Sequence, residues 1–424
     1  MKKLARNITK PARVKTLTLH TTQGDAGTLH RESQFVVRYN DEALKGQELA
    51  ISLTMPPRPD GWISNQIPPI LAMNLPEGFL LQRVHERYRK VMDIDDDMNL
   101  LAVTSTPTAG RVWASTAEKN EEGLPEAISL RDILVHKGAE ELFDELLERF
   151  ATASISGVQP KVVVPEKQNG PDIDVATASD LVEKSSIKSP DLIVKAAGDD
   201  YPDLAENEYI CMSLAKHVGL VTPEFWLSDD RKLFVIRRFD VGPRGYLGFE
   251  DMAVLMGKHP SKKYEGSYAD VARAIGDFAG LAHRNASIDA FFRLTVLNCL
   301  IRNGDAHLKN FGILYGDPKS ADDDARLAPV YDVVCTTVYI PKDVLALSLA
   351  SSKLWPDRKT LERFGRDVCD LRNASAIIEE LIERAADYKY ENAEAKMWQR
   401  VRAQLQIGLG SIRSPKKFPL ASQK

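Results

Sequence analysis

A short polar string in the second half of the chain holds the residue types that transfer phosphate. The string is Asn303-Gly304-Asp305-Ala306-His307-Leu308-Lys309-Asn310, and Asp332 follows it after a stretch that reads as a hairpin. Asp305 can orient a hydroxyl group and accept its proton, while Asn310 and Asp332 can hold Mg2+ on a nucleoside triphosphate. Such a pair suits Mg2+, which keeps waters and phosphate oxygens as its other ligands. The string therefore predicts phosphoryl transfer from ATP, with Asp305 as the catalytic residue and Asn310 and Asp332 as the Mg2+ ligands.

The surroundings of this string strengthen a motif that is weak alone, since Asp and Asn are common in loops. Residues 287–302 are apolar on most faces and predict a buried helix, with Gly304 as the residue that follows its C-terminus. Asp332 follows the apolar pair Pro329-Val330. No other ligand lies at metal-binding spacing from His307, so we expect His307 to hold the loop by hydrogen bonds.

Lys195 ends an apolar strand predicted over residues 192–195. A buried lysine is costly unless it is paired, and Glu208 on the next predicted helix is a plausible partner. Such a pair would place Lys195 on the α- and β-phosphates of ATP. Glu206 is a competing partner, and an ordinary edge-strand lysine is the simpler alternative.

A loop one strand upstream lies where a phosphate-covering segment would be expected. Its sequence is Ser154-Ile155-Ser156-Gly157-Val158-Gln159-Pro160-Lys161. The backbone N–H groups of Gly157, Val158 and Gln159 can bind phosphate and Lys161 can add charge, although the loop is not a Walker A sequence. Phosphorylation of Ser154 or Ser156 would add negative charge there and oppose nucleotide binding.

The order of predicted elements gives the fold class. Residues 14–55 alternate and predict a small antiparallel sheet that includes a strand at 49–53 and is ended by three prolines. Further strands are predicted at 192–195, 223–227 and 233–236, and the chain after Asp240 is expected to be mainly helical. This order predicts an α+β, two-lobed, protein-kinase-like fold. Its expected parts are a β-rich N-terminal subdomain (1–115), the rest of the first lobe (116–238) and a helical lobe (239–424).

The overall composition excludes some classes of protein. The net charge of the 424 residues is -4, so no global basic field would draw the whole molecule onto nucleic acid. No apolar run approaches the ~18 residues that a membrane helix needs. The four cysteines are far apart among apolar neighbours, which predicts buried free thiols and a cytoplasmic protein. The basic residues 1–15 read as a solvated tail or as an arm that touches DNA or a partner.

Taken together, these strings resemble the HipA-type bacterial serine/threonine kinases, the toxin half of toxin–antitoxin pairs. The resemblance covers nearly the whole chain. It includes the two strings already described, Leu75-Pro76-Glu77-Gly78, Ile193-Val194-Lys195, Glu206-Asn207-Glu208, Arg238-Phe239-Asp240, Glu250-Asp251 and Pro329-Val330-Tyr331-Asp332.

The resemblance implies an ATP- and Mg2+-dependent toxin that phosphorylates a protein, usually an aminoacyl-tRNA synthetase, and so inhibits translation and arrests growth. It implies inactivation by autophosphorylation at Ser154 or Ser156, and neutralisation by a small helix-turn-helix antitoxin through which the protein would reach DNA. An adenine hinge would be formed by Ile236, Arg237, Arg238 and Phe239. Arg237 departs from the family pattern, in which a glutamate often precedes the Arg-Phe-Asp triplet.

Two alternatives come from other classes of protein. A small-molecule kinase of the aminoglycoside or choline type also has an aspartate followed by an asparagine five residues later, but the N-terminal sheet and the Ser154–Lys161 loop count against it. A non-catalytic, nucleotide-binding co-repressor is the second alternative. The presence of all of Lys195, Asp305, Asn310 and Asp332 argues against a dead kinase.

Overall fold

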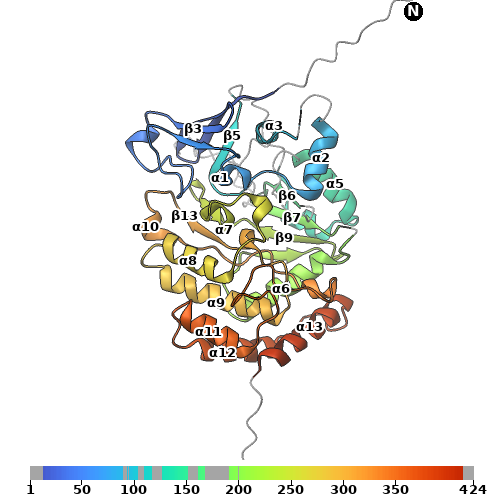
Figure 1. Ribbon diagram of the computed structural model, residues 1–424. Helices are drawn as coiled ribbons and strands as arrows, with labels where there is room; N and C mark the ends of the chain where they lie inside the picture. Colours follow the sequence, from blue (N-terminus) through green and yellow to red (C-terminus); the bar gives the residue numbers. More distant parts are fainter. Residues whose placement is uncertain are drawn as a thin grey trace, which may run out of the picture.

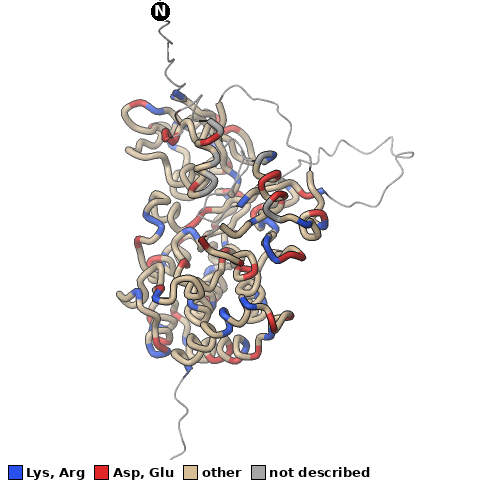
Figure 2. Tube along the Cα trace, turned by 90° about the vertical axis from the view of Figure 1, so that its right-hand side faces the viewer, with Lys and Arg blue, Asp and Glu red and all other residues tan. Residues whose placement is uncertain are grey.

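The computed structural model describes residues 13–88, 93, 95–103, 109–116, 127–150, 161–167, 191–198 and 200–413. An N-terminal sheet lies at one end of the molecule, a second sheet lies in the middle, and the last helices lie at the other end (Figure 1). Positive and negative residues are interspersed along the described chain (Figure 2). No helix of this part of the chain is long and apolar enough to cross a lipid bilayer.

The N-terminal sheet is antiparallel, as predicted, but its membership differs from the prediction. Its strands are β1 (Thr16–Thr21), β2 (Gly24–Arg31), β3 (Phe35–Tyr39), β4 (Trp62–Ser64) and β5 (Val112–Ser115), in the order β4-β3-β2-β1-β5. The strand predicted at 49–53 is wrong, because Leu53 donates its N–H to the Glu250 carboxylate and not to a neighbouring strand. The prolines do not end the sheet, since β4 follows them. The short helices here are η1 (Ala43–Lys45), α1 (Pro69–Ala72), α2 (Gly78–Tyr88) and α3 (Asp97–Val103).

The middle sheet separates two hydrophobic cores. Its strands are β6 (Lys161–Val164), β7 (Leu192–Ala196), β9 (Leu233–Arg237) and β8 (Phe225–Leu227), antiparallel and in that spatial order. Alternate residues of β9 face opposite ways, so Val235 belongs to the core that includes α5 (Ala139–Phe150), and Phe234 to the core that includes α6 (Leu204–His217). The remaining helix of this region is α4 (Leu130–Val135).

The chain after Asp240 contains the expected helices and two small sheets, of which only the hairpin that leads to Asp332 was predicted. One sheet pairs β10 (Val241–Gly242) with β11 (Gly245–Tyr246), and the other contains β12 (Gly248–Asp251), β13 (Gly312–Tyr315) and β14 (Arg326–Leu327). The helices of this part of the chain are α7 (Met252–Leu255), η2 (Pro260–Lys262), α8 (Tyr268–Phe278), α9 (Arg284–Leu300), η3 (Leu308–Asn310), α10 (Ala321–Asp324), η4 (Thr336–Val338), α11 (Arg358–Asp367), α12 (Ala374–Asp387) and α13 (Lys396–Ile412). The three-stranded sheet β12-β13-β14 includes the predicted hairpin.

Helix α9 is the buried helix predicted from the apolar run, and it supports the polar string that follows it. Its last turn is not ended by Gly304 as predicted, because Arg302 already takes the left-handed conformation with φ of 58°. Gly304 is needed for space, since a Cβ there would lie 2.1 Å from Oδ2 of Asp343. Helix α13 packs so closely on the end of α9 that a Cβ at Gly408 would lie 2.0 Å from the Leu300 carbonyl oxygen.

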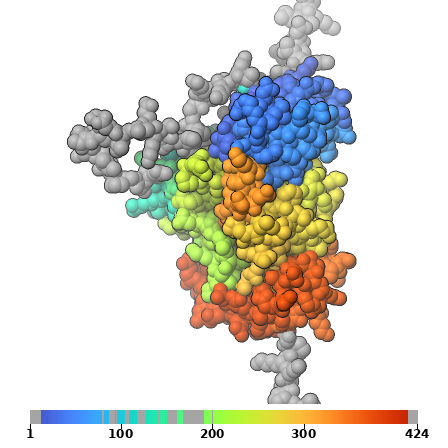
Figure 3. All heavy atoms as spheres, turned by 90° about the vertical axis from the view of Figure 1, so that its left-hand side faces the viewer, coloured from blue at the N-terminus to red at the C-terminus, as the bar shows by residue number. Residues whose placement is uncertain are grey.

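Buried polar contacts attach the N-terminal sheet region to the rest of the molecule. The fully buried Glu250 carboxylate of β12 accepts hydrogen bonds from Ser52 Oγ at 2.6 Å, from Leu53 N at 2.8 Å and from Tyr315 Oη at 2.6 Å. At the surface of the same junction Lys319 pairs with Glu48 at 2.5 Å. Figure 3 shows the blue N-terminal region seated directly on the yellow and orange parts of the later chain.

The four cysteines, Cys211, Cys299, Cys335 and Cys369, are buried and free, as predicted.

Candidate active site

One large cavity collects most of the predicted site residues that the structure describes. Its volume is about 1060 Å3, which is enough for a nucleotide. Strand β7 contributes Lys195 to its wall, the loop after α9 contributes Asp305, and the segment after β14 contributes Asp332. The cavity therefore lies where the middle sheet meets the later chain.

Lys195 is the electrostatic centre of this cavity. Strand β7 is an interior strand of its sheet, so the edge-strand alternative is wrong. The buried Lys195 Nζ lies 2.5 Å from Glu208 Oε1 and 2.8 Å from Asp332 Oδ1. Glu206, the competing partner, pairs with Arg231 at 2.5 Å. The predicted pairing of Lys195 with Glu208 is thus present, and Asp332 joins it.

Two carboxylates hold the charge on Lys195. Burial lowers the pKa of Lys195, but the charges of Asp332 and Glu208 raise it by more, so the pKa of Lys195 lies above its ordinary value. Burial also raises the pKa of Asp332, yet Lys195 and Lys161 outweigh it, so that pKa lies well below its usual range. Lys195 and Asp332 are therefore both ionised at neutral pH. The pKa of Lys161, which also lines the cavity, is lowered by burial.

Backbone and side-chain contacts fix the loop that carries Asp305. Asn303 Oδ1 accepts a hydrogen bond from Asp305 N at 3.1 Å, and Gly304 N donates to Thr336 Oγ1 at 2.8 Å. The Asp305 carboxylate accepts a hydrogen bond from Tyr264 Oη at 2.7 Å. Burial raises the pKa of Asp305, the hydrogen bond from Tyr264 lowers it, and the nearby Asp332 raises it, so the pKa lies above its ordinary value. An aspartate with this environment is suited to take a proton from a hydroxyl group.

The two predicted metal ligands lie side by side. Asn310 Nδ2 donates to Asp332 Oδ2 at 2.9 Å, and Asn310 Oδ1 accepts from the backbone N–H of His307 at 3.0 Å. Asp332 itself takes a left-handed backbone conformation with φ of 57°, which is uncommon outside glycine. In this conformation its side chain lies toward Asn310.

His307 holds the loop through its backbone N–H, which donates to Asn310 Oδ1. The ring is buried, which lowers its pKa to about 3, so the imidazole is neutral at pH 7. Its Nδ1 has no hydrogen-bond partner among the described residues, and its ring lies 5.1 Å from that of Tyr264. The predicted role in holding the loop therefore belongs to the His307 N–H group.

These residues fit Mg2+ bound to a nucleotide. Asp332 and Asn310 offer one carboxylate and one amide, the small protein contribution that Mg2+ takes when phosphates and waters complete its shell. The Asn310 amide would have to turn to offer its oxygen beside Asp332, because its nitrogen now faces that carboxylate. Lys195 and Lys161 line the same cavity and suit the charge of a polyphosphate.

The predicted adenine hinge also lines the cavity, and it brings an aromatic wall. Ile236, Arg237, Arg238 and Phe239 all face the cavity. The backbone N–H groups of Arg237 and Arg238 donate to the carbonyl oxygens of Glu224 at 2.8 Å and Asp191 at 2.7 Å, so these two N–H groups are already engaged. The Phe239 ring lies 5.3 Å from both Phe249 and Tyr331.

The segment that follows Asp332 is tied to helix α6. Asn207 Nδ2 donates to the Cys335 carbonyl oxygen at 3.1 Å, and Cys335 N donates to Asn207 Oδ1 at 2.9 Å. Both residues are buried. This reciprocal pair fixes the backbone three residues beyond Asp332.

Several residues of the cavity were not predicted as site residues. Glu77 pairs with Lys309 at 2.9 Å and with Lys263 at 3.3 Å, and Tyr264 contacts Asp305. Glu77 lies in the string Leu75-Pro76-Glu77-Gly78, and Lys309 lies in the string that carries Asp305. Lys263 and Tyr264 carry no sequence signal, since they belong to a polar stretch without a recognisable pattern.

The phosphate-loop prediction is only partly described. Ser154, Ser156, Gly157, Val158 and Gln159 lie outside the described residues. Lys161 opens β6 and lines the cavity, where it is paired in register with Lys195 of the neighbouring strand.

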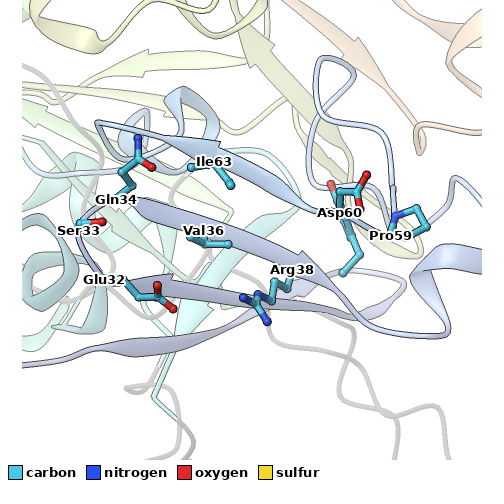
Figure 4. Close-up of a pocket in the computed structure, with 9 residues that line it drawn as sticks. Glu32, Ser33, Gln34, Val36, Arg38, Pro59, Asp60 and Ile63 are labelled. Atoms are coloured by element: carbon cyan, nitrogen blue, oxygen red, sulfur yellow. The ribbon is translucent and has the colours of Figure 1, made fainter.

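A second, smaller hollow of about 320 Å3 lies on the N-terminal sheet (Figure 4). Side chains of β3 and β4, including Val36, Arg38 and Ile63, line it together with Glu32 and Asp60 from the connecting loops. It shares no lining residue with the large cavity and brings no predicted site residue together. The candidate active site is therefore the larger cavity.

Comparison with known proteins agrees with this assignment of the fold. A family model described as the HipA-like C-terminal domain matches residues 153–388, more than half of the chain. The chain belongs to the HipA family. A model described as the HipA N-terminal domain matches residues 17–115 as well. The two family models together therefore cover nearly all of the N-terminal sheet and most of the residues that line the large cavity.

Curated relatives match shorter stretches. A Sinorhizobium fredii protein named "Putative kinase Y4dM" is 33% identical over 177 residues, which are 38% of this chain and 41% of that protein. A Haemophilus influenzae protein named "Putative kinase" is 30% identical over 206 residues, 44% of this chain and 53% of that protein. The chain thus spans about two fifths to one half of the length of these relatives.

A solved HipA structure confirms the fold class. It comes from the toxin–antitoxin system of Shewanella oneidensis MR-1, in complex with HipB and operator DNA. The match has a TM-score of 0.69 at 20% sequence identity and covers 93% of this chain and 97% of that one. The predicted α+β fold, with a β-rich N-terminal region and a helical C-terminal part, is therefore confirmed.

Proposed function

We propose that this protein is an ATP- and Mg2+-dependent kinase that phosphorylates serine or threonine hydroxyl groups of another protein. The observation that carries the proposal is the arrangement around Asp332, whose two carboxylate oxygens contact Lys195 at 2.8 Å and Asn310 at 2.9 Å in the cavity that Asp305 lines. Relatives named as kinases support it. The N-terminal sheet of the HipA family favours it over a small-molecule kinase.

The residues of the cavity divide the work of a kinase among them. MgATP, when bound, supplies the phosphoryl group and neutralises part of its charge. Lys195, held by Glu208, would position the phosphates, and Asn310 with Asp332 would hold the metal. Asp305 would orient the acceptor hydroxyl and accept its proton, which its raised pKa favours. Phe239 and its aromatic neighbours would contact the adenine base of ATP.

The biological setting is part of the same proposal. We infer a toxin that acts on a protein such as an aminoacyl-tRNA synthetase, arrests growth and is inactivated by autophosphorylation at Ser154 or Ser156. A small helix-turn-helix antitoxin would neutralise it and link it to DNA. The structure of the Shewanella oneidensis HipA with HipB and operator DNA supports such a partner.

Replacement of Asp305, the proposed catalytic base, tests the proposal. We expect Asp305→Asn to lower the transfer of labelled γ-phosphate to the protein itself and to lysate proteins by roughly 10²- to 10⁴-fold, because the acceptor hydroxyl would lose its proton acceptor. The matched control is Asp322→Asn, at an exposed aspartate of α10, which should label like the wild type. Labelling by Asp305→Asn at the wild-type rate would exclude the assigned mechanism.

A further inference from the structure

Tyr264 lies directly against the proposed catalytic base, although it comes from a remote loop. It lies two residues beyond η2, and 41 residues separate it from Asp305 along the chain. Its hydroxyl donates to Asp305 Oδ1 at 2.7 Å, while 43% of the residue remains exposed. The other oxygen of Asp305, Oδ2, has no hydrogen-bond partner among the described residues.

Contacts on both sides of Tyr264 hold the phenol in place. The Lys263 carbonyl oxygen accepts a hydrogen bond from Leu308 N at 3.0 Å, which ties this segment to the catalytic loop. Lys263 Nζ lies 3.3 Å from Glu77 at the start of α2, and Lys353 Nζ donates to the Tyr264 carbonyl oxygen at 3.3 Å. The segment that carries the Tyr264 phenol is thus held by three separate parts of the chain.

The direction of the hydrogen bond follows from the charges. Burial and the neighbouring Asp305 raise the pKa of Tyr264 well above its ordinary value, so the phenol keeps its proton at neutral pH. It can therefore only donate to the ionised carboxylate. A carboxylate held by one oxygen presents the other in a fixed direction, and such fixed geometry is what a general base needs.

We propose that Tyr264 is a positioning residue that holds Asp305 through Oδ1 and leaves Oδ2 for the acceptor hydroxyl. The exposed ring of Tyr264 forms the wall beside which the acceptor segment of the protein substrate lies. This inference rests on the proposed kinase function, and it adds a residue that supports the base without contacting the nucleotide.

The test compares Tyr264→Phe with Tyr390→Phe in the full-length protein. Tyr390 is a matched control, because its hydroxyl also contacts a carboxylate, Glu206, at 3.4 Å, but outside the cavity. The rate of transfer from labelled ATP is measured for self-labelling and for casein as the acceptor. We expect Tyr264→Phe to lower kcat by roughly 10- to 100-fold, since small misplacements of a reacting group have effects of that size. The KM for ATP should change by less than about twofold, as for a residue that does not touch the nucleotide.

The pH profile separates positioning from a general structural effect. The Tyr264 hydrogen bond lowers the pKa of Asp305, so its loss should raise that pKa. Because the base must be deprotonated, the acid limb of the kcat/KM profile should then move to higher pH in Tyr264→Phe and stay in place in Tyr390→Phe.

A wild-type rate in Tyr264→Phe or an unchanged acid limb of its pH profile would overturn the inference. Phosphate found on Tyr264 itself by mass spectrometry would also overturn it, because Tyr264 would then be an acceptor. If the wild type labels nothing, the proposed function fails, and the inference is then decided by crystal structures with AMP-PNP. The Asp305 carboxylate should turn in Tyr264→Phe relative to the wild type. A wild-type complex in which the Tyr264 hydroxyl lies beyond hydrogen-bond distance of Asp305 would contradict the inference.

Discussion

At the scale of single residues, Lys195 and Glu208 form the pair that is hardest to bury. Neither has appreciable solvent exposure, and the two charges stabilise each other at 2.5 Å. Asp332 is less buried, and it adds a second carboxylate on the cavity side. The pair therefore contributes to stability as well as to the proposed function, and the two roles can be separated by mutation.

We predict that Lys195→Met lowers the free energy of unfolding by roughly 3–5 kcal/mol, since it leaves the Glu208 carboxylate buried without its cation. The double variant with Glu208→Gln should recover much of that loss, because an amide costs less to bury than an unpaired charge. Urea unfolding measures both. Neither variant should regain phosphoryl transfer. Equal stabilities of the two variants would show that the carboxylate finds another partner.

At the scale of elements, α13 packs closely on the end of α9, the helix that precedes the loop carrying Asp305. The Leu300 carbonyl leaves no room for a side chain at Gly408, whereas a Cβ added at Gly410 on the same helix would meet nothing within 4 Å. The two glycines are thus a matched pair, one fixed by packing and the other exposed.

We expect Gly408→Ala to destabilise the protein by about 1–3 kcal/mol, because an added methyl group in a packed contact forces the helices apart. It should also lower phosphoryl transfer, since α9 supports Asp305. Gly410→Ala should raise stability by up to about 1 kcal/mol through helix propensity alone. Thermal unfolding of the two variants, followed by an activity assay, checks this. Similar effects of the two substitutions would argue against the close packing.

Elements and site residues that depend on neighbouring sequence were predictable. Asp305 and Asn310 share one string, and the hairpin returns the chain to Asp332, so local spacing was enough to predict their meeting. Lys195 and Glu208 lie on consecutive elements and could be predicted as a pair for the same reason. These contacts use short connections and strong hydrophobic patterns.

Contacts between distant segments were not predictable from the sequence. Tyr264 reaches Asp305 because a polar loop packs on the loop that carries Asp305, and no periodic pattern marks such a polar loop. Leu53 lies in an apolar run that favours a strand, but its N–H is taken by Glu250, 197 residues away. Gly304 resembled a helix end, whereas its real constraint is the side chain of Asp343. Tertiary contacts decided each case.

At the scale of the whole molecule, the N-terminal sheet region is attached through a buried junction centred on Glu250. Three donors converge on this carboxylate from Ser52, Leu53 and Tyr315. The surface pair of Lys319 with Glu48 crosses the same junction in contact with solvent. The buried contacts should dominate, because exposed ion pairs are screened by water and salt.

We predict that Glu250→Ala costs about 3 kcal/mol or more, since it leaves buried donors without an acceptor. Hydrogen exchange in β1–β3 should become faster as the sheet region loosens. Glu48→Ala should have no measurable effect on either quantity. Urea unfolding and hydrogen-exchange mass spectrometry make the comparison. A larger effect at Glu48 than at Glu250 would refute the importance of the buried junction.

The link between Asn207 and Cys335 has a consequence for inhibitor chemistry. Swinging Asp332 outward would break its contacts to Lys195 and Asn310, and the Asn207–Cys335 link resists movement of the segment only three residues further on. A compound that required such a rearrangement would have to offset all of these losses before it gained affinity. Drug-like molecules aimed at this protein should therefore succeed by filling the large cavity as it stands, not by trapping a displaced aspartate.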